Sequence, residues 1–152
     1  MPIVIRRAGP ADADLVVDFN RRLAEESEGL TLDPALLTAG VAQALADSQK
    51  GHYFLASDAG QVVGQMMITT EWSDWRNGWF WWIQSVYVRA EARRRGIFRA
   101  LFDHVSQAAR QDPSVIGLRL YVDRENHAAQ QTYRRMGMKE TEYFVLEKYP
   151  LR

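Results

Sequence analysis

An arginine-rich turn is the part of the sequence whose residue types and spacing most clearly indicate chemistry. Residues 93–96 are Arg-Arg-Arg-Gly, and Arg99 follows shortly after. The turn comes after a strand-like run at residues 85–88 and opens a segment with helical spacing of apolar residues. At a helix N-terminus the backbone N–H groups and the helix dipole favour an anion, and glycine lets it approach closely. The turn therefore predicts a phosphate site; a solvated basic turn at the start of an amphipathic helix is the alternative.

The expected phosphate site does not match two widespread phosphate-binding signatures. The Gly-Lys-Ser/Thr ending of a P-loop is missing, and so are the three spaced glycines of the dinucleotide fingerprint. The amides of residues 94–99 are expected to make the main contacts, and arginine side chains would add charge-assisted hydrogen bonds. The expected ligand group is a pyrophosphate.

A second set of spaced residues lies downstream, on a segment typical of a short helix. Asn126, Ala129, Tyr133 and Gly137 follow one another there. Together with the arginine–glycine turn, this order resembles the GNAT superfamily of N-acetyltransferases. The family carries a strand, then Arg/Gln-x-x-Gly-x-small, then a helix, and later Asn-x-x-Ala-x-x-x-Tyr before a Gly–aromatic pair. Each motif is short, and their order and spacing over nearly the whole chain carry the resemblance.

Two positions depart from the family pattern. Phe98 stands where glycine or alanine is usual, and Met138 replaces the common phenylalanine after the glycine. The expected phosphate contacts are backbone amides, so neither change removes them. The ring of Phe98 must point away from the phosphates for the site to work.

The resemblance implies that acetyl-CoA is the co-substrate. It places the contacts to acetyl-CoA on the strand before the turn, on the turn itself and on the downstream motif. The residues expected to bind it are Val86, Tyr87, Val88, Arg93, Arg94, Arg95, Gly96, Ile97, Phe98, Arg99, Asn126 and Ala129.

In the family an amine attacks the thioester directly, without a covalent enzyme intermediate. The resemblance implies that the backbone N–H of Val86 or a neighbour steadies the thioester oxygen as it gains charge. It also implies that Tyr133 protonates the departing thiolate, since a tyrosine with a pKa of about 10 is protonated at neutral pH. The alternatives are a packed core aromatic for Tyr133 and a plain helix N-cap for Asn126.

The general base is not evident from the sequence. Many relatives carry a glutamate on the strand before the turn, where this chain has Gln84 and Ser85. Glu71, at the end of the preceding strand, is the first candidate and would act through water. Glu26, expected in the loop after the first helix, is the second. Either residue has a surface glutamate as its alternative.

All five tryptophans fall within residues 72–82. The segment resembles the Trp-bearing loop of the polyamine and thialysine branch of the family, although the acids of that branch are replaced here by Gln84 and Ser85. With Glu71 and Asp74, these aromatic rings could form a pocket for an ammonium group. Packing across strands or across a dimer interface is the alternative, and the two are compatible.

The elements that must position these residues follow from hydrophobic spacing and turn residues. Strands are expected at residues 3–7, 52–57, 61–70, 79–88, 115–122 and 142–148. Helices are expected from residue 14 to an acidic loop at 25–29, and at 34–45, 96–110 and 127–136. The expected fold class is α/β, an α+β mixed sheet of the GNAT type. It is a mostly antiparallel sheet with one parallel, splayed pair of strands and flanking helices.

Length and composition limit the remaining possibilities. The chain of 152 residues predicts one domain, residues 1–152, here an N-acetyltransferase domain. There is no cysteine, which excludes disulfides and thiol chemistry and fits a cytoplasmic location. The three histidines lack ligand spacing, so no metal is expected. No apolar run predicts a membrane span.

The function expected is acetyl transfer from acetyl-CoA to a primary amine of a small molecule or peptide. The resemblance also implies that a second copy of the chain is a partner, in a homodimer. A non-catalytic acyl-CoA sensor is one alternative. A nucleic-acid-binding module is another, against which the balance of 19 basic and 19 acidic residues argues.

Overall fold

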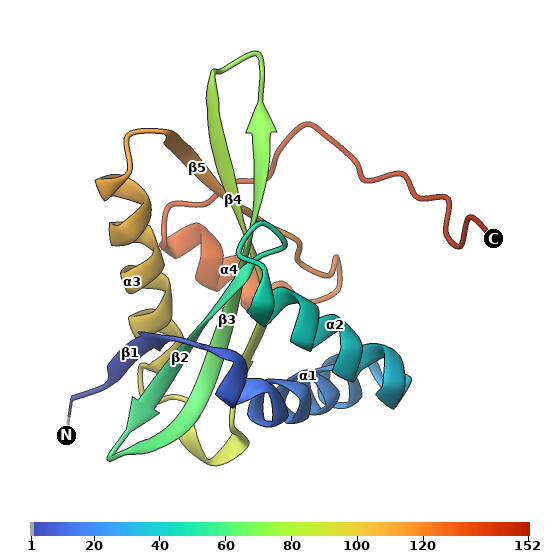
Figure 1. Cartoon of the computed structure of the whole chain (residues 1–152). Coiled ribbons are helices and arrows are strands. Elements are labelled where there is room, and N and C mark those ends of the chain that lie inside the picture. The colour runs from blue at the N-terminus through green and yellow to red at the C-terminus, as the bar shows by residue number, and fades with distance from the viewer. Residues whose placement is uncertain (1) are drawn as a thin grey trace. The chain divides into compact units, whose positions relative to one another are not determined.

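The structure, a computed structural model, describes residues 2–152 (Figure 1). These residues divide into two units, the first ending at Leu120 and the second comprising Tyr121–Arg152. The strands of the first unit are β1 (Val4–Arg7), β2 (His52–Asp58), β3 (Gln61–Ser73), β4 (Gly78–Val88) and β5 (Val115–Leu120). Its helices are α1 (Ala13–Glu28), α2 (Pro34–Ala46) and α3 (Ile97–Gln111), with short 3-10 turns η1 (Pro10–Asp12) and η2 (Ala90–Ala92). The second unit contains α4 (His127–Arg135).

The strands of the first unit form one sheet in chain order, β1-β2-β3-β4-β5. Its first three pairings are antiparallel, and β4 pairs with β5 in parallel. Helix α3 makes the crossover between these two parallel strands, as a parallel pair requires. The predicted fold class, a mostly antiparallel mixed sheet with one parallel pair and flanking helices, is confirmed.

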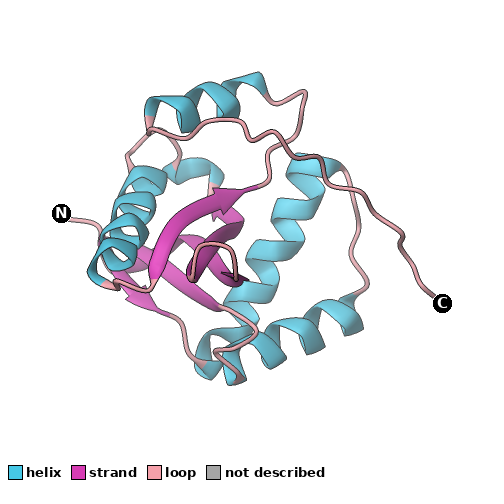
Figure 2. Ribbon diagram, turned by 90° about the horizontal axis from the view of Figure 1, so that it is seen from above, coloured by secondary structure: helices cyan, strands magenta, loops and turns pink. Residues whose placement is uncertain are grey.

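Helices cover both faces of this sheet (Figure 2). Tyr53 of β2 belongs to a buried cluster with Val16 of α1 and Val41 of α2. The next residue, Phe54, places its ring 5.1 Å from that of His104 on α3. Since successive side chains of a strand point to opposite faces, α1 and α2 cover one face and α3 covers the other.

Capping residues set the ends of the first two helices. Asp33 is the N-cap of α2, since its side chain accepts hydrogen bonds from the amides of Ala35 and Leu36. Helix α1 ends at Gly29, whose φ of 62° suits glycine. The helix therefore continues through Glu28, and the prediction that Glu26 lies in a loop was wrong: it lies in the last turn of α1.

The strand predicted at residues 142–148 is also wrong. That segment of the second unit has no regular secondary structure. Its large apolar side chains, among them Phe144 and Leu146, are exposed. A strand needs a neighbour to satisfy its backbone, and the alternation of side chains that favoured a strand does not supply one. Gly137, with φ 92°, follows α4 as expected of a C-terminal glycine.

Candidate functional site

The turn before α3 leaves the first amides of that helix without a side-chain cap. Gly96 is the N-cap residue, with φ 81°, and no side chain of residues 2–152 caps the amides of the first turn. The first turn contains no acidic residue. A Cβ at Gly96 would meet no heavy atom within 4 Å, so the approach to the helix end is open. This combination of uncapped amides, a positive helix end and open space suits an anion.

The arginines of the turn are mostly engaged by acids of the first unit. Arg93 pairs with Glu26, Arg95 with Asp58, and Arg99 with Asp103 at 3.1 Å. Arg94, with φ 65°, makes no ion pair with any described residue. Three of the four arginines expected to contact the phosphates are thus paired with acids, and Arg94 is the one without an ion pair to a described residue.

The start of α3 lies close against the sheet because β3 has a glycine there. A Cβ at Gly64 would lie 2.9 Å from Cγ2 of Ile97 and 3.1 Å from the carbonyl oxygen of Tyr87. Gly64 therefore lets the first residue of α3 approach both strands closely. Phe98 directs its ring along the helix, 6.0 Å from that of Phe102.

Strand β4 changes character halfway along its length. Its parallel pairing with β5 ends at Ile83 and Leu120, so among the described residues 84–88 pair only with β3. Gln65 pairs with Tyr87 and Met67 with Gln84, so β4 carries one extra residue there, a β-bulge. Strand β5 ends there, at the end of the first unit, so the splay expected between the two parallel strands stays a prediction.

Tyr87, just beyond the bulge, joins the strand to α1. Its hydroxyl donates to Glu26 at 2.6 Å, and Arg93 pairs with the other oxygen of the same carboxylate. These hydrogen bonds, from Tyr87 first and Arg93 second, lower the pKa of Glu26. Burial and the neighbouring carboxylate raise the pKa of Tyr87. Glu26 is therefore ionised and Tyr87 protonated at neutral pH.

Glu71 lies in a different place from Glu26. It pairs with Phe80, and it lies four residues along β3 from Met67, the residue that pairs with Gln84 at the bulge. Four residues of a strand span about 13 Å. Its carboxylate accepts hydrogen bonds from Trp82 Nε1 at 2.9 Å and from Arg119 at 3.1 Å. The two candidate bases are thus separate, and Glu26 is the one bonded to the part of β4 beyond the bulge.

The downstream motif lies in the second unit. Asn126 is the N-cap of α4, and its Oδ1 accepts a hydrogen bond from the amide of Ala129 at 3.1 Å. Tyr133 lies on the same helix, and burial raises the pKa of its hydroxyl. A raised pKa keeps Tyr133 protonated, which is the state that a general acid needs.

The tryptophans are divided between the two faces of the β3–β4 hairpin, the long pair of strands at the top of Figure 1. Trp72 and Trp79 meet edge to face at 5.0 Å, and Trp81 meets His52 at 6.1 Å. Trp82 points to the opposite face, toward Glu71. Trp75, at the hairpin turn, is 84% exposed. Cross-strand packing accounts for part of the segment, whereas the pocket and the dimer interface both stay predictions.

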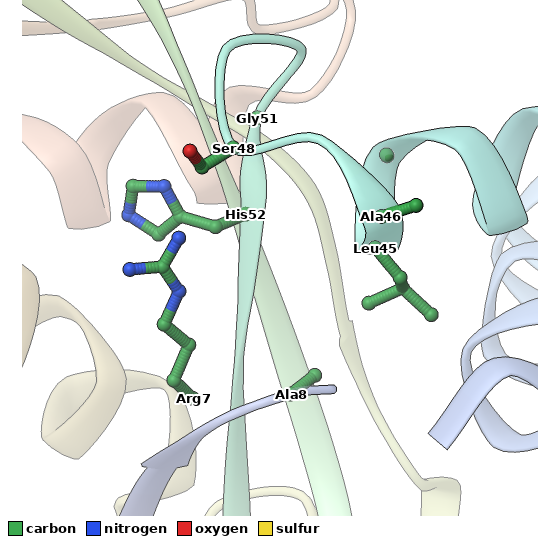
Figure 3. A pocket seen from close by; sticks show the side chains of 8 residues that line it. Arg7, Ala8, Leu45, Ala46, Ser48, Gly51 and His52 are labelled. Carbon is green, nitrogen blue, oxygen red and sulfur yellow. The ribbon is translucent and has the colours of Figure 1, made fainter. Parts of the chain in front are cut away.

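A pocket of about 190 Å³ lies between the end of β1, the end of α2 and the start of β2 (Figure 3). Arg7, Ser48 and His52 supply its polar side chains, and the end of α2 lines the other side. Its lining includes none of the site residues predicted from the sequence. Among residues 2–152, no helix is long and apolar enough to cross a bilayer. The same residues contain no group of three His, Cys, Asp or Glu side chains arranged to hold a metal.

Two residues at this site were not singled out from the sequence. Asp58 holds Arg95 across the turn, and Gln65 contacts the bulge of β4 through its side chain. A polar residue in the middle of the apolar run of β3 is the one available signal for Gln65. Nothing in the spacing pointed to Asp58.

Comparisons with known proteins agree with this geometry. The model of the acetyltransferase (GNAT) family matches residues 18–138. A possible acetyltransferase from Clostridium difficile 630 is 45% identical, with a TM-score of 0.93 and 100% of each chain covered. No curated protein matches the sequence.

More distant structures share the fold. A predicted acetyltransferase with acetyl-CoA from Clostridium acetobutylicum is 18% identical, with a TM-score of 0.78, covering 97% of this chain and 96% of the other. The ribosomal-protein-alanine N-acetyltransferase of Brucella melitensis biovar Abortus 2308 is 16% identical, with a TM-score of 0.79, covering 97% and 99%. The chain therefore belongs to the GNAT family of acetyltransferases, which use acetyl-CoA as their co-substrate.

Proposed function

We propose that this protein transfers an acetyl group from acetyl-CoA to a primary amine of a small molecule or peptide by direct attack of the amine. The observation that carries the proposal is the open part of β4. Beyond Ile83 no described residue pairs with the strand on its β5 side, the strand bulges directly after, and it continues into a turn that ends at the uncapped start of α3. The open edge of β4 would bind the thioester, and the uncapped start of α3, which follows it along the chain, would bind the pyrophosphate.

The residues present fit acetyl-CoA. The uncapped amides at the start of α3 and the unpaired Arg94 would hold the pyrophosphate, and Gly96 leaves room for it. The backbone of Val86 and Val88 would line the open edge of β4. The bound co-substrate supplies the activated acetyl group. All other chemistry comes from the protein and the amine.

Each step of the transfer has a proposed residue. The N–H of Val86 steadies the thioester oxygen, and Tyr133, protonated because of its raised pKa, donates a proton to the departing thiolate. Glu26 is our first choice as proton acceptor, through water, because it is ionised and because its hydrogen bond from Tyr87 places it beside the part of β4 beyond the bulge. Glu71, paired with Arg119, is the second.

Calorimetry and a turnover screen test the proposal together. The wild-type protein is expected to bind CoA and acetyl-CoA, and to release CoA when offered one of a panel of amines, amino acids and N-terminal peptides. Absence of CoA binding at millimolar concentration contradicts the proposal. Binding without turnover on any acceptor supports the non-catalytic sensor instead.

Tyr133→Phe separates the two possibilities once an acceptor is known. Loss of the hydroxyl is expected to lower kcat by roughly 100-fold, within the range typical of a general acid, and to leave the CoA dissociation constant within twofold. An unchanged kcat would make the assignment of Tyr133 wrong. Glu26→Gln and Glu71→Gln, compared in the same assay, rank the two candidate bases.

The proposal includes a cytoplasmic location and a homodimer. The cysteine-free composition supports the first, and family resemblance supports the second. Cell fractionation and sedimentation equilibrium of the full chain test these two statements separately from the activity.

A further inference from the structure

Gln65 is buried where a strand normally carries an apolar residue. Its side chain lies in the middle of β3 and is 0% exposed. Burying an amide costs free energy unless its polar atoms are hydrogen-bonded, and an apolar residue of similar size would fill the same space without that cost. Oε1 of Gln65 has no hydrogen-bond partner among the described residues. The hydrogen bonds that hold this side chain are therefore those donated by its amide nitrogen, Nε2.

The amide nitrogen of Gln65 donates to two oxygens. One is the carbonyl oxygen of Ser85 in the β4 bulge, at 2.9 Å, and the other is Oδ1 of Asn20 on α1, at 3.2 Å. Asn20 in turn donates to the hydroxyl of Tyr53 on β2 at 3.4 Å. A buried line of polar groups thus runs from α1 and β2 to the bulge. The carbonyl of Ser85 can only accept, so this contact requires a donor at Gln65.

The bulge is a conformation that needs such a support. Ser85 has a φ of 49°, in the left-handed region that a residue with a Cβ rarely occupies. Residues keep such a conformation only where surrounding contacts stabilise it, and they are frequent at functional sites. The hydrogen bond from Gln65 to Ser85 is a contact of this kind, made from the neighbouring strand.

Holding the carbonyl of Ser85 also sets the direction of one N–H group. The C=O of Ser85 and the N–H of Val86 belong to the same planar trans peptide unit, in which they point in opposite directions. Since the carbonyl points to the side chain of Gln65, on the face of the sheet that α1 covers, the N–H of Val86 points away from that side chain. Among the described residues, none pairs with this stretch of β4 on its β5 side.

From this geometry, and resting on the function proposed above, we infer that Gln65 is a positioning residue for acetyl transfer. By holding the carbonyl of Ser85, it aims the N–H of Val86 at the thioester oxygen. Gln65 itself touches no reactant. Its removal should therefore affect the acetyl group and its transfer, and leave the binding of the CoA pyrophosphate at the start of α3 unchanged.

Gln65→Leu, which keeps the size and removes the donor, is the main test. With the amine that wild type uses best, kcat is expected to fall at least tenfold while KM for acetyl-CoA stays within twofold. Gln61→Leu, the same change at the exposed start of β3, is the matched control and should leave both constants unchanged. A kcat of Gln65→Leu within twofold of wild type overturns the inference.

A second readout does not depend on turnover. In amide NMR spectra of wild type, acetyl-CoA should shift the Val86 resonance in a way that CoA does not, while both ligands shift Ile97 and Phe98. Gln65→Leu should lose the acetyl-specific shift at Val86 and keep the other two. Retention of that shift in the variant contradicts the inference. Absence of all three shifts in wild type contradicts the proposed function instead, so the two failures are distinguishable.

Gln65→Glu provides a rescue that a merely structural role would not give, and it remains usable if the leucine variant does not fold. A protonated carboxyl can donate to the carbonyl of Ser85, and an ionised one cannot. The ratio of its kcat to that of wild type is expected to rise as the pH falls, whereas the ratio for Gln65→Leu stays flat. A flat ratio for Gln65→Glu counts against the inference.

Discussion

The two halves of β4 share one strand and differ in almost everything that surrounds them. From Trp79 to Ile83 the strand pairs with β3 on one side and β5 on the other. From residue 84 onward its partners among the described residues all belong to β3, and it bulges at Ser85. We call these the paired half and the open half. A strand with two neighbours has its backbone groups occupied, whereas one with a free edge can offer them to a ligand.

The means of stabilisation differ in the same way. In the paired half, side chains hold one another: the guanidinium of Arg119 lies 3.6 Å over the ring of Phe80 and also bonds Glu71. In the open half, side chains hold the backbone, as Gln65 does at Ser85 and Arg93 does at the carbonyl of Val88. Large side chains thus stabilise the paired half by contacting one another, and fix the backbone geometry of the open half by hydrogen-bonding its carbonyl groups.

Gly96→Asp should have the largest effect of the changes considered, and only on ligand binding. Aspartate tolerates the left-handed φ of this position and would cap α3 itself. Its charge would stand where the pyrophosphate is expected, so CoA affinity should fall roughly 100-fold, or about 2.7 kcal/mol. Calorimetry measures the affinity, and urea unfolding should find stability little changed.

Gly96→Asn is the matched control for that change. Asparagine has nearly the same shape and the same tolerance of positive φ, but no charge. Its loss of CoA affinity should be at least tenfold smaller than that of Gly96→Asp. Equal losses for the two variants would mean that steric filling, and not an anion site, explains the result.

Gly64→Ala should come second, as a change in stability. The new Cβ would lie 2.9 Å from Ile97 and 3.1 Å from the carbonyl of Tyr87 in the open half. Overpacking of this kind costs about 1–3 kcal/mol of unfolding free energy. Gly40→Ala, in the exposed part of α2 with nothing within 4 Å, should instead be neutral or stabilising, by up to about 1 kcal/mol. Equal effects in urea unfolding would refute the close approach.

Trp82→Phe probes the paired half and should have a smaller effect. It removes the hydrogen bond from the indole to Glu71, which we expect to cost about 0.5–1.5 kcal/mol of stability and no CoA affinity. Trp75→Phe, at a residue that is 84% exposed, should change stability by less than about 0.5 kcal/mol. A loss of CoA binding in Trp82→Phe would break the division between the two halves.

His52, whose ring contacts Trp81 of the paired half, should give the smallest effect. Burial, with a smaller contribution from Arg7, lowers its pKa below 6.5. The neutral form is thus favoured in the folded protein, and its contribution to stability is present above pH 6.5 and lost as the pH falls toward the folded pKa. The unfolding free energy of wild type minus that of His52→Gln should therefore decrease from pH 7.5 to pH 5. A constant difference would contradict this.

Local signals were enough to predict much of the fold. The helix expected at residues 34–45 and the strands expected at residues 61–70 and 79–88 each follow from turn residues and hydrophobic spacing near in sequence. The helix start at Gly96 was predicted in the same way, from the glycine itself and from the helical spacing of apolar residues that follow it.

Features that depend on pairing between distant residues were missed. The bulge depends on the register between Gln65 and Tyr87, and single-sequence periodicity does not contain that register. The pairing of Glu26 with Arg93 depends on where α1 ends and which strand it meets. The segment at residues 142–148 shows the converse, since its alternation predicted a strand for which the described residues provide no partner.

Hydrogen exchange with and without CoA tests the division of β4 most directly. Saturating CoA is expected to slow amide exchange in residues 84–88 and in the first turn of α3, and to leave exchange in residues 79–83 of the paired half unchanged. Slowing confined to the paired half, or none at all in the presence of saturating CoA, would contradict it.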